Sequence, residues 1–171
     1  QVLRLDPAEQ IVLFDGMGGE FRAEIVELAK RRTSLRLLHF DAVERESPLA
    51  ITLVQALATS DKMDLIVQKA VELGVAMVQP VSTERATLKL SADRAEKRAA
   101  HWQAIARAAC EQCGRNRVPV VAEPQSLDQW LAGPPDGVRL MLQPDAAASL
   151  LDAAGAQSRI ALLIGPEGGF S

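Results

Sequence analysis

A glycine-rich turn close to the end of the sequence is the sharpest candidate for ligand chemistry. The apolar run 159–164 leads directly into Gly165, Pro166, Glu167, Gly168 and Gly169. A strand this apolar is typical of parallel sheets, whose ligands bind beyond the carboxyl ends of the strands. Glycine lets the backbone approach such a ligand closely. The turn has neither the Gly-Lys-Ser of a Walker loop nor dinucleotide-fingerprint spacing, and an ordinary strand-to-helix turn is the alternative interpretation.

The charged residues are distributed unevenly, which matters more than the formal net charge of -3. Residues 85–117 contain eight basic and three acidic side chains, a net of +5, whereas residues 118–171 contain two basic and six acidic ones, a net of -4. Arg115 and Arg117 follow a predicted helix end, where guanidinium groups can reach phosphates. We interpret the basic segment as a possible RNA surface, with a solvated helix face as the alternative.

The pattern of cysteines and histidines does not indicate a catalytic or metal site. Cys110 and Cys113 have the spacing of a redox or half-zinc motif, but the chain has no second pair. Both fall on the apolar stripe late in a predicted helix, whereas reactive thiols favour helix N-termini, so we expect core packing. His39 and His101 have no carboxylate or nucleophile arranged around them in the sequence and receive no role. We therefore expect no metal site.

Two different patterns of secondary structure must position these residues. Up to residue 46 the chain contains short apolar or alternating runs, which predict a small β-barrel or curled sheet over residues 1–46. From about residue 50 strands alternate with helices, which predicts a mainly parallel sheet covered by helices over residues 50–171. The sequence thus predicts an α/β fold with a small N-terminal β domain, and the polar segment 44–48 is the candidate linker.

The elements of the second part are marked by their periodicity and by their end signals. An apolar stripe from Met63 to Val71 predicts a helix that begins with Ser60 or Asp61 as its cap and ends at Gly74. On the polar face of this helix Lys69 and Glu72 can pair at i,i+3. A long helix is predicted from about Ala92 to Cys113 and ends before Gly114. The other predicted elements are strands 51–57, 75–81, 118–122, 138–142 and 159–164, and helical segments 127–131 and 146–154.

Composition excludes several classes of protein. With 171 residues, 48% hydrophobic and 24% charged, the chain is neither collagen-like, disordered nor a disulfide scaffold. No apolar run approaches the roughly 18 residues of a membrane span. Two cysteines fit a reducing compartment, so we expect a cytoplasmic protein. Because the chain starts at Gln1 and stops just after a glycine turn, we expect sequence to be missing at both ends.

Four stretches, taken together and in this order, resemble a known family. They are DKM at 61–63, QKAVELGV at 68–75, EQCGRNRVP at 111–119 and IGPEGGFS at 164–171. They resemble the RsmE family of the SPOUT superfamily, and the resemblance covers essentially the whole chain. The family comprises S-adenosylmethionine-dependent methyltransferases that methylate N3 of one uridine in the small-subunit (16S) ribosomal RNA. Its N-terminal part is a PUA-like RNA-binding barrel.

The resemblance implies a cofactor site and an RNA surface on this chain. Residues 165–169 match the family's first loop for S-adenosylmethionine, with Leu142 as a neighbour of the adenosine pocket. The basic residues that we place on the RNA surface are Arg4, Lys69, Arg115 and Arg117. The resemblance further implies a homodimer that acts on small-subunit RNA or on the assembled 30S subunit, with no membrane and no metal.

The chain departs from the family after the glycine loop. The family continues with several dozen residues, including a Leu-Gly-x-Arg-Ile-Leu-Arg stretch that completes the cofactor pocket and the trefoil knot. This stretch is absent here, as is the first strand of the barrel, so we expect an incomplete chain that binds cofactor poorly. No general base can be named. The alternatives are another SPOUT methyltransferase of rRNA or tRNA bases, or a non-catalytic RNA-binding module.

Overall fold

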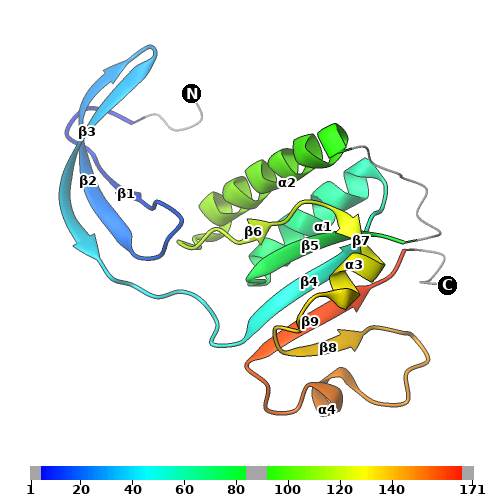
Figure 1. The fold of residues 1–171 in the computed structure, drawn as a ribbon. Coiled ribbons are helices and arrows are strands. Elements are labelled where there is room, and N and C mark those ends of the chain that lie inside the picture. Colours follow the sequence, from blue (N-terminus) through cyan, green and yellow to red (C-terminus); the bar gives the residue numbers. More distant parts are fainter. Residues whose placement is uncertain (1–4, 84–91, 167–171) are drawn as a thin grey trace. The chain divides into compact units, whose positions relative to one another are not determined.

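The structure is a computed structural model and describes residues 5–83 and 92–166. The chain divides into two compact units, whose elements are labelled in Figure 1. The first unit consists of residues up to Glu46 together with Gly114–Val118, and the second of Ser47–Cys113 and the residues from Pro119 onward. The predicted α/β class is confirmed, with an antiparallel sheet in the first unit and a parallel sheet in the second. Within the described ranges, no helix combines the length and apolarity needed to cross a membrane.

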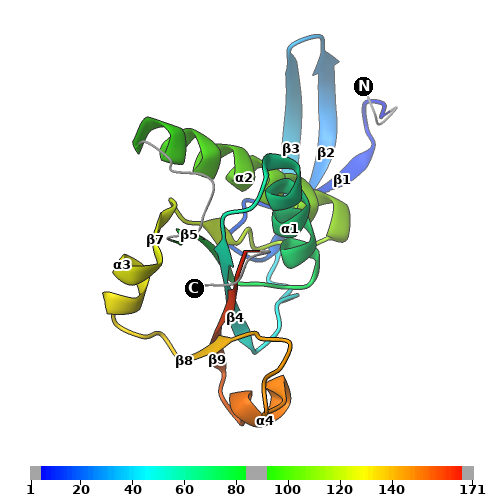
Figure 2. The same ribbon diagram turned by 90° about the vertical axis from the view of Figure 1, so that its right-hand side faces the viewer.

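The alternating pattern near the start of the chain forms an antiparallel sheet in the order β1-β2-β3. Its strands are β1 (Gln10–Leu13), β2 (Glu20–Ala29) and β3 (Arg32–Asp41). The described residues of this unit thus form a three-stranded antiparallel sheet, and the barrel stays a prediction. β2 and β3 make a long hairpin that is seen clearly in Figure 2.

The turn between β1 and β2 requires glycine. Gly16, Gly18 and Gly19 all have positive φ angles, of 87°, 98° and 72°. A Cβ at Gly19 would lie 2.2 Å from the ring of Phe40, so a side chain there would clash as well as strain the backbone. The turn thus brings β2 close against β3, where the rings of Phe21 and Phe40 lie 4.9 Å apart.

The second unit is built on parallel strands in the order β6-β5-β4-β9-β8, with β7 also pairing with β5. The register aligns Val54 of β4 with Leu163 of β9 and Gln79 of β5. β9 has the bounds predicted from its apolar run. The strands are β4 (Ala50–Ala56), β5 (Met77–Ser82), β6 (Val120–Val121), β7 (Gln125–Ser126), β8 (Val138–Met141) and β9 (Arg159–Ile164).

Helices cover both faces of this sheet. α1 (Ser60–Glu72) and α3 (Leu127–Ala132) lie on opposite faces in Figure 2, and α1 packs against α2 (Ala92–Cys113). Leu127 and Trp130 of α3 pack on a cluster formed by Val54, Ala56, Val81, Ala161 and Leu163. The apolar stripes predicted for the two long helices include the buried residues Met63 and Val67 of α1 and Trp102 and Ala106 of α2.

Three details differ from the sequence predictions. Thr59, rather than Ser60 or Asp61, is the N-cap residue of α1, and its side chain makes no capping hydrogen bond. α4 (Leu150–Ala154) is shorter than predicted because the Ser149 hydroxyl accepts a hydrogen bond from the backbone N–H of Asp152 at 3.2 Å and so fixes the helix start. Cys110 is buried as expected, but Cys113 is exposed, because the last turn of α2 lies outside the core.

Candidate functional site

The carboxyl edge of the parallel sheet is where the topology predicts a ligand. From β4 the chain moves to β5 and β6 on one side, and later returns to β8 and β9 on the other side. β4 and β9 thus lie side by side at the centre of the sheet, and open α/β sheets bind ligands outside the carboxyl ends of their strands. Gln55 of β4 is aligned with Ile164 of β9 at this edge. Gly165 and Pro166 follow directly, and both are partly exposed.

A cavity of about 580 Å³ opens beside this edge, between the end of β8 and α4. Leu142, predicted to border an adenosine pocket, is one of its lining residues. The backbone N–H of Leu142 donates a hydrogen bond to the carbonyl of Leu163 at 2.9 Å, so β9 holds this lining residue in place. The other lining residues are Leu140, Met141, Gln143, Pro144, Ala146, Ala148, Ser149, Leu150 and Ala153.

The chemistry of this lining suits a nucleoside better than a charged metabolite. The volume of the cavity lies within the range of small-molecule sites, and the side chains that line it are mostly apolar. Gln143 and Ser149 supply side-chain polar groups, and neither is ionised. The residues present therefore fit the adenosyl part of S-adenosylmethionine. Glu167, Gly168 and Gly169, the rest of the predicted loop, lie outside the described residues.

The residues predicted to contact RNA belong to different units of the chain. Arg4 lies outside the described residues. Lys69, on α1, belongs to the parallel-sheet unit and donates to Glu72 at 2.8 Å, which confirms the predicted i,i+3 pair. Arg115 and Arg117 instead belong to the antiparallel unit, although they follow α2 in the sequence.

Arg115 holds the 114–118 segment to its own unit. Its side chain is only 9% exposed, and the guanidinium donates to both carboxylate oxygens of Glu46, with Nε 3.0 Å from Oε1. The adjacent Asn116 is buried and donates from Nδ2 to the carbonyl of Val43 at 2.9 Å. The sequence did not predict this pairing, because Glu46 and Arg115 are more than sixty residues apart in it. An RNA contact by Arg115 stays a prediction. The guanidinium is turned to a carboxylate rather than presented to solvent.

Arg117 differs from Arg115 in exposure. Its side chain is 51% exposed, and Nε lies 3.3 Å from Oε2 of Glu44. The backbone around it pairs with the glycine turn, where the N–H of Val118 donates to the carbonyl of Gly16 at 3.1 Å. A Cβ at Gly18 would lie 2.8 Å from the Arg117 guanidinium, so glycine leaves room for this side chain.

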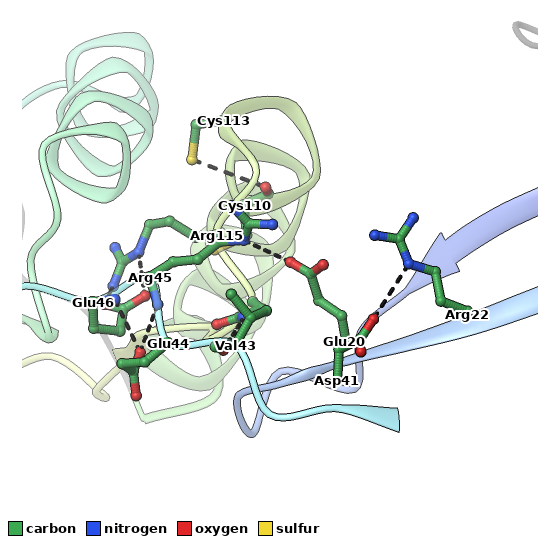
Figure 3. Close-up of polar contacts among 11 residues, drawn as sticks. Glu20, Arg22, Asp41, Val43, Glu44, Arg45, Glu46, Cys110, Cys113 and Arg115 are labelled. Atoms are coloured by element: carbon green, nitrogen blue, oxygen red, sulfur yellow. Dashed lines mark hydrogen bonds and ion pairs between the residues drawn. The ribbon is translucent and has the colours of Figure 1, made fainter. Parts of the chain in front are cut away.

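Other carboxylates of the antiparallel unit also form ion pairs with arginines, some of which are drawn in Figure 3. Arg45 Nε donates to Oε1 of Glu20 at 2.6 Å, and this hydrogen bond is the main cause that lowers the pKa of the nearly buried Glu20 carboxyl. The same contact raises the pKa of Arg45. The pKa of Glu44 is lowered mainly by the backbone N–H of Glu46, with a smaller contribution from Arg117. Both carboxylates are therefore held in their charged form.

The structure also shows contacts among residues that received no functional role from the sequence. His101 Nε2 lies 2.9 Å from Oδ2 of Asp64, and the indole Nε1 of Trp102 donates to Oδ1 of the same carboxylate at 3.1 Å. No nearby signal in the sequence predicts this contact, because Asp64 lies on α1 and the other two residues lie on α2. The cluster joins the two helices. No group of residues suited to hold a metal ion occurs among the residues that the structure describes.

Comparison with protein families gives two matches that together account for nearly all of the sequence. The RNA methyltransferase domain family matches residues 45–171. The RNA methyltransferase PUA domain family matches residues 1–38.

Individual relatives agree with these family matches. The ribosomal RNA small subunit methyltransferase E of Buchnera aphidicola is 30% identical over 172 residues, which cover 100% of this chain and 70% of that protein. The crystal structure of the Neisseria gonorrhoeae protein of the same name, bound to S-adenosyl methionine, superposes with a TM-score of 0.91 at 42% identity, covering 99% of this chain and 71% of that one. A Legionella pneumophila structure with the cofactor SAM bound has a TM-score of 0.92 at 39% identity, with 99% and 70% covered.

Proposed function

This chain belongs to the family of the ribosomal RNA small subunit methyltransferases E, and we propose that it uses S-adenosylmethionine to methylate N3 of a uridine in small-subunit ribosomal RNA. The observation that carries the proposal is the cavity of about 580 Å³ at the carboxyl edge of the parallel sheet, beside the strand that leads into Gly165 and Pro166. The solved Neisseria gonorrhoeae relative, which superposes over 99% of this chain, was crystallised with this cofactor.

The residues around the cavity would hold the cofactor by its nucleoside. Leu140, Leu142 and Pro144 offer apolar surface to an adenine ring, and the backbone after β9 can approach the ligand closely because it begins with Gly165. When bound, S-adenosylmethionine supplies an electrophilic methyl group on a sulfonium. The contribution of the protein is to hold the acceptor in line with that methyl, since positioning accounts for much of the catalysis of a displacement.

The acceptor places its own demands on the protein. N3 of uridine carries a proton that must leave, so a base or a group that stabilises the uridine anion is required. N3 is also hydrogen-bonded in a base pair, so the target uridine must be unpaired or extruded from its helix, at a cost of a few kcal/mol. These demands call for an RNA-binding surface that positions the target. Arg117 and Lys69, both about half exposed, are the described residues from our sequence prediction that can serve it.

Further expectations belong to the same proposal. The complete protein would be a homodimer with a trefoil knot that closes the cofactor pocket, in the cytoplasm where ribosomal RNA is found. Its substrate would be small-subunit RNA, either free or within the 30S subunit. We infer these properties from the family resemblance of the sequence.

The test is to locate the methyl group on the product. The full-length protein is incubated with unmodified small-subunit RNA and isotopically labelled S-adenosylmethionine, and the nucleosides are separated and identified by mass spectrometry. We expect labelled 3-methyluridine. Label on carbon 5 or on a ribose oxygen would contradict the N3 assignment while preserving methyl transfer. RNA binding with no cofactor binding in calorimetry would favour the non-catalytic RNA-binding module.

A further inference from the structure

Five of the arginines that the structure describes in the antiparallel unit lie against a carboxylate. The pairs are spread over the sheet and over the segments after it, and part of this network is drawn in Figure 3. Arg115–Glu46 is the most buried of these pairs, and in the Arg45–Glu20 pair the carboxylate is buried while the arginine is about half exposed. The pairs are Arg22–Asp41, Arg36–Glu24, Arg45–Glu20, Arg115–Glu46 and Arg117–Glu44.

The tip of the β2–β3 hairpin is the exception. Lys30, Arg31 and Arg32 are consecutive at the turn, and all three are exposed. Among the residues that the structure describes, none of the three forms an ion pair. Residues 27–34 contain one carboxylate, that of Glu27, which is aligned with Ser34 across the hairpin. In the described part of this unit, the positive charge that remains unpaired is therefore concentrated at the hairpin tip.

The geometry of the tip suits phosphate groups. Ala29 pairs with Arg32 in the last rung of the ladder, so Arg32 ends the sheet and Lys30 and Arg31 form the turn beyond it. Figure 2 shows this turn at the end of the hairpin. An arginine guanidinium can hold a phosphate with two parallel hydrogen bonds. No aromatic residue lies within residues 26–34, so the tip lacks a side chain on which a base could stack. These features predict contacts with the RNA backbone rather than with bases.

We propose that the hairpin tip, Lys30–Arg31–Arg32, is a phosphate-binding surface that positions the RNA substrate. The proposal rests on the proposed function, and it makes the tip, rather than the neutralised Arg115, the main electrostatic contact of this unit with RNA. The RNA methyltransferase PUA domain family matches residues 1–38, a range that contains the tip. Contacts of this kind release counterions from the RNA, so they make affinity depend on salt and little on sequence.

The test compares two matched double variants of the full-length protein. Arg31→Gln with Arg32→Gln removes two cations at the tip, and Arg22→Gln with Arg36→Gln removes two paired cations from the same sheet. Affinity for a fluorescently labelled fragment of small-subunit RNA is measured by anisotropy at several salt concentrations. We expect the tip variant to bind about tenfold more weakly, with the slope of log affinity against log salt reduced by roughly 1.4 to 1.8, and the control to change less than twofold.

Two further readouts separate a surface effect from a structural one. Thermal unfolding and calorimetric binding of S-adenosylmethionine should be unchanged in both variants. If both variants lost RNA affinity equally, the tip would contribute no more than any other cations of the sheet, and the proposal would be overturned. Wild-type affinity and salt slope in the tip variant would also overturn it while leaving methyl transfer intact. A wild-type protein that binds no RNA would overturn the proposed function as well.

Discussion

The two units of this protein are stabilised by different means. In the described part of the chain, the buried apolar side chains of the antiparallel unit are Ala23 and Ile25, whereas the parallel-sheet unit buries a large set that includes Val54, Trp102 and Leu163. The antiparallel unit instead contains most of the described ion pairs. One unit is therefore built around a large apolar core, whereas the other buries few apolar side chains and contains one largely buried ion pair, Arg115–Glu46.

This difference shows where each unit can offer chemistry to a ligand. In the parallel-sheet unit the strands are buried, so a ligand meets the strand ends and the loops beyond them. There the cavity beside Leu142 is found. In the antiparallel unit most charges are cancelled in pairs, so a charge that has no partner in the described structure marks the surface open to a polyanion. Four predictions test this contrast, beginning with the largest expected effect.

Loss of a large core side chain should affect the parallel-sheet unit most. Trp102 is 1% exposed, and its indole also donates to Asp64. We expect Trp102→Ala to lower the free energy of unfolding by about 3–5 kcal/mol, measured by urea denaturation. Leu73→Ala is the control, because Leu73 is 84% exposed on the C-cap of α1, and it should change stability by less than about 0.5 kcal/mol. Similar losses in both variants would contradict the account of this core.

The antiparallel unit should be most sensitive to the loss of its largely buried ion pair. Arg115→Ala leaves the carboxylate of Glu46, which is 18% exposed, without this partner, and should lower the free energy of unfolding by about 3 kcal/mol. Arg117→Ala removes an exposed contact two residues away and should cost less than about 1 kcal/mol. Chemical denaturation of both variants measures the difference. If Arg117→Ala proved the more destabilising, the assignment of Arg115 as the anchor of the segment would be wrong.

The cavity should respond to a charge introduced into its lining. Leu142→Asp places a carboxylate on an apolar wall, and we expect the dissociation constant for S-adenosylmethionine to rise at least about tenfold, as measured by calorimetry on the full-length protein. Leu151→Asp is the matched control, since Leu151 is 83% exposed on α4 and does not line the cavity. An unchanged affinity in the Leu142 variant would place the cofactor elsewhere.

Acidification should weaken the antiparallel unit through Glu20. Its pKa is lowered from the ordinary value of 4.5, so the folded state favours the carboxylate, and the resulting stability is present above pH 4.5 and lost as the pH falls through the folded-state pKa. We expect Glu20→Gln to make stability less dependent on pH in this acidic range. Unfolding followed from pH 3 to pH 6 tests this. A wild-type slope in the variant would exclude Glu20 as a source of the dependence.

The apolar pattern allowed much of the parallel-sheet unit to be predicted. β9 and α2 have their predicted bounds, because a wholly apolar run and a long apolar stripe each have one favourable structure. Helix starts were predicted less well. The alanine-rich stretch before Ser149 has the composition of a helix, and the hydrogen bond that fixes the actual start at Leu150 depends on local geometry.

The polar contacts of the antiparallel unit could not be predicted. Arg115 and Glu46 are charged residues far apart in the sequence, and each has many possible partners until the fold brings them together. Periodicity does not show which charges will be cancelled. The sequence therefore predicted a basic loop at Arg115 and Arg117, where the structure shows an ion-paired segment. The three basic residues of the hairpin tip are visible in the sequence. That they form no ion pair in the described structure, unlike the other arginines of the unit, could not be predicted.

Hydrogen exchange measured by mass spectrometry on the full-length protein tests the central contrast most directly. S-adenosylmethionine and small-subunit RNA are added in separate experiments. We predict that the cofactor protects backbone amides in residues 140–153 and in those just after β9, and leaves residues 27–34 unchanged. RNA should protect residues 27–34. Protection by the cofactor at the hairpin tip, or by RNA at the cavity alone, would contradict the division of roles between the two units.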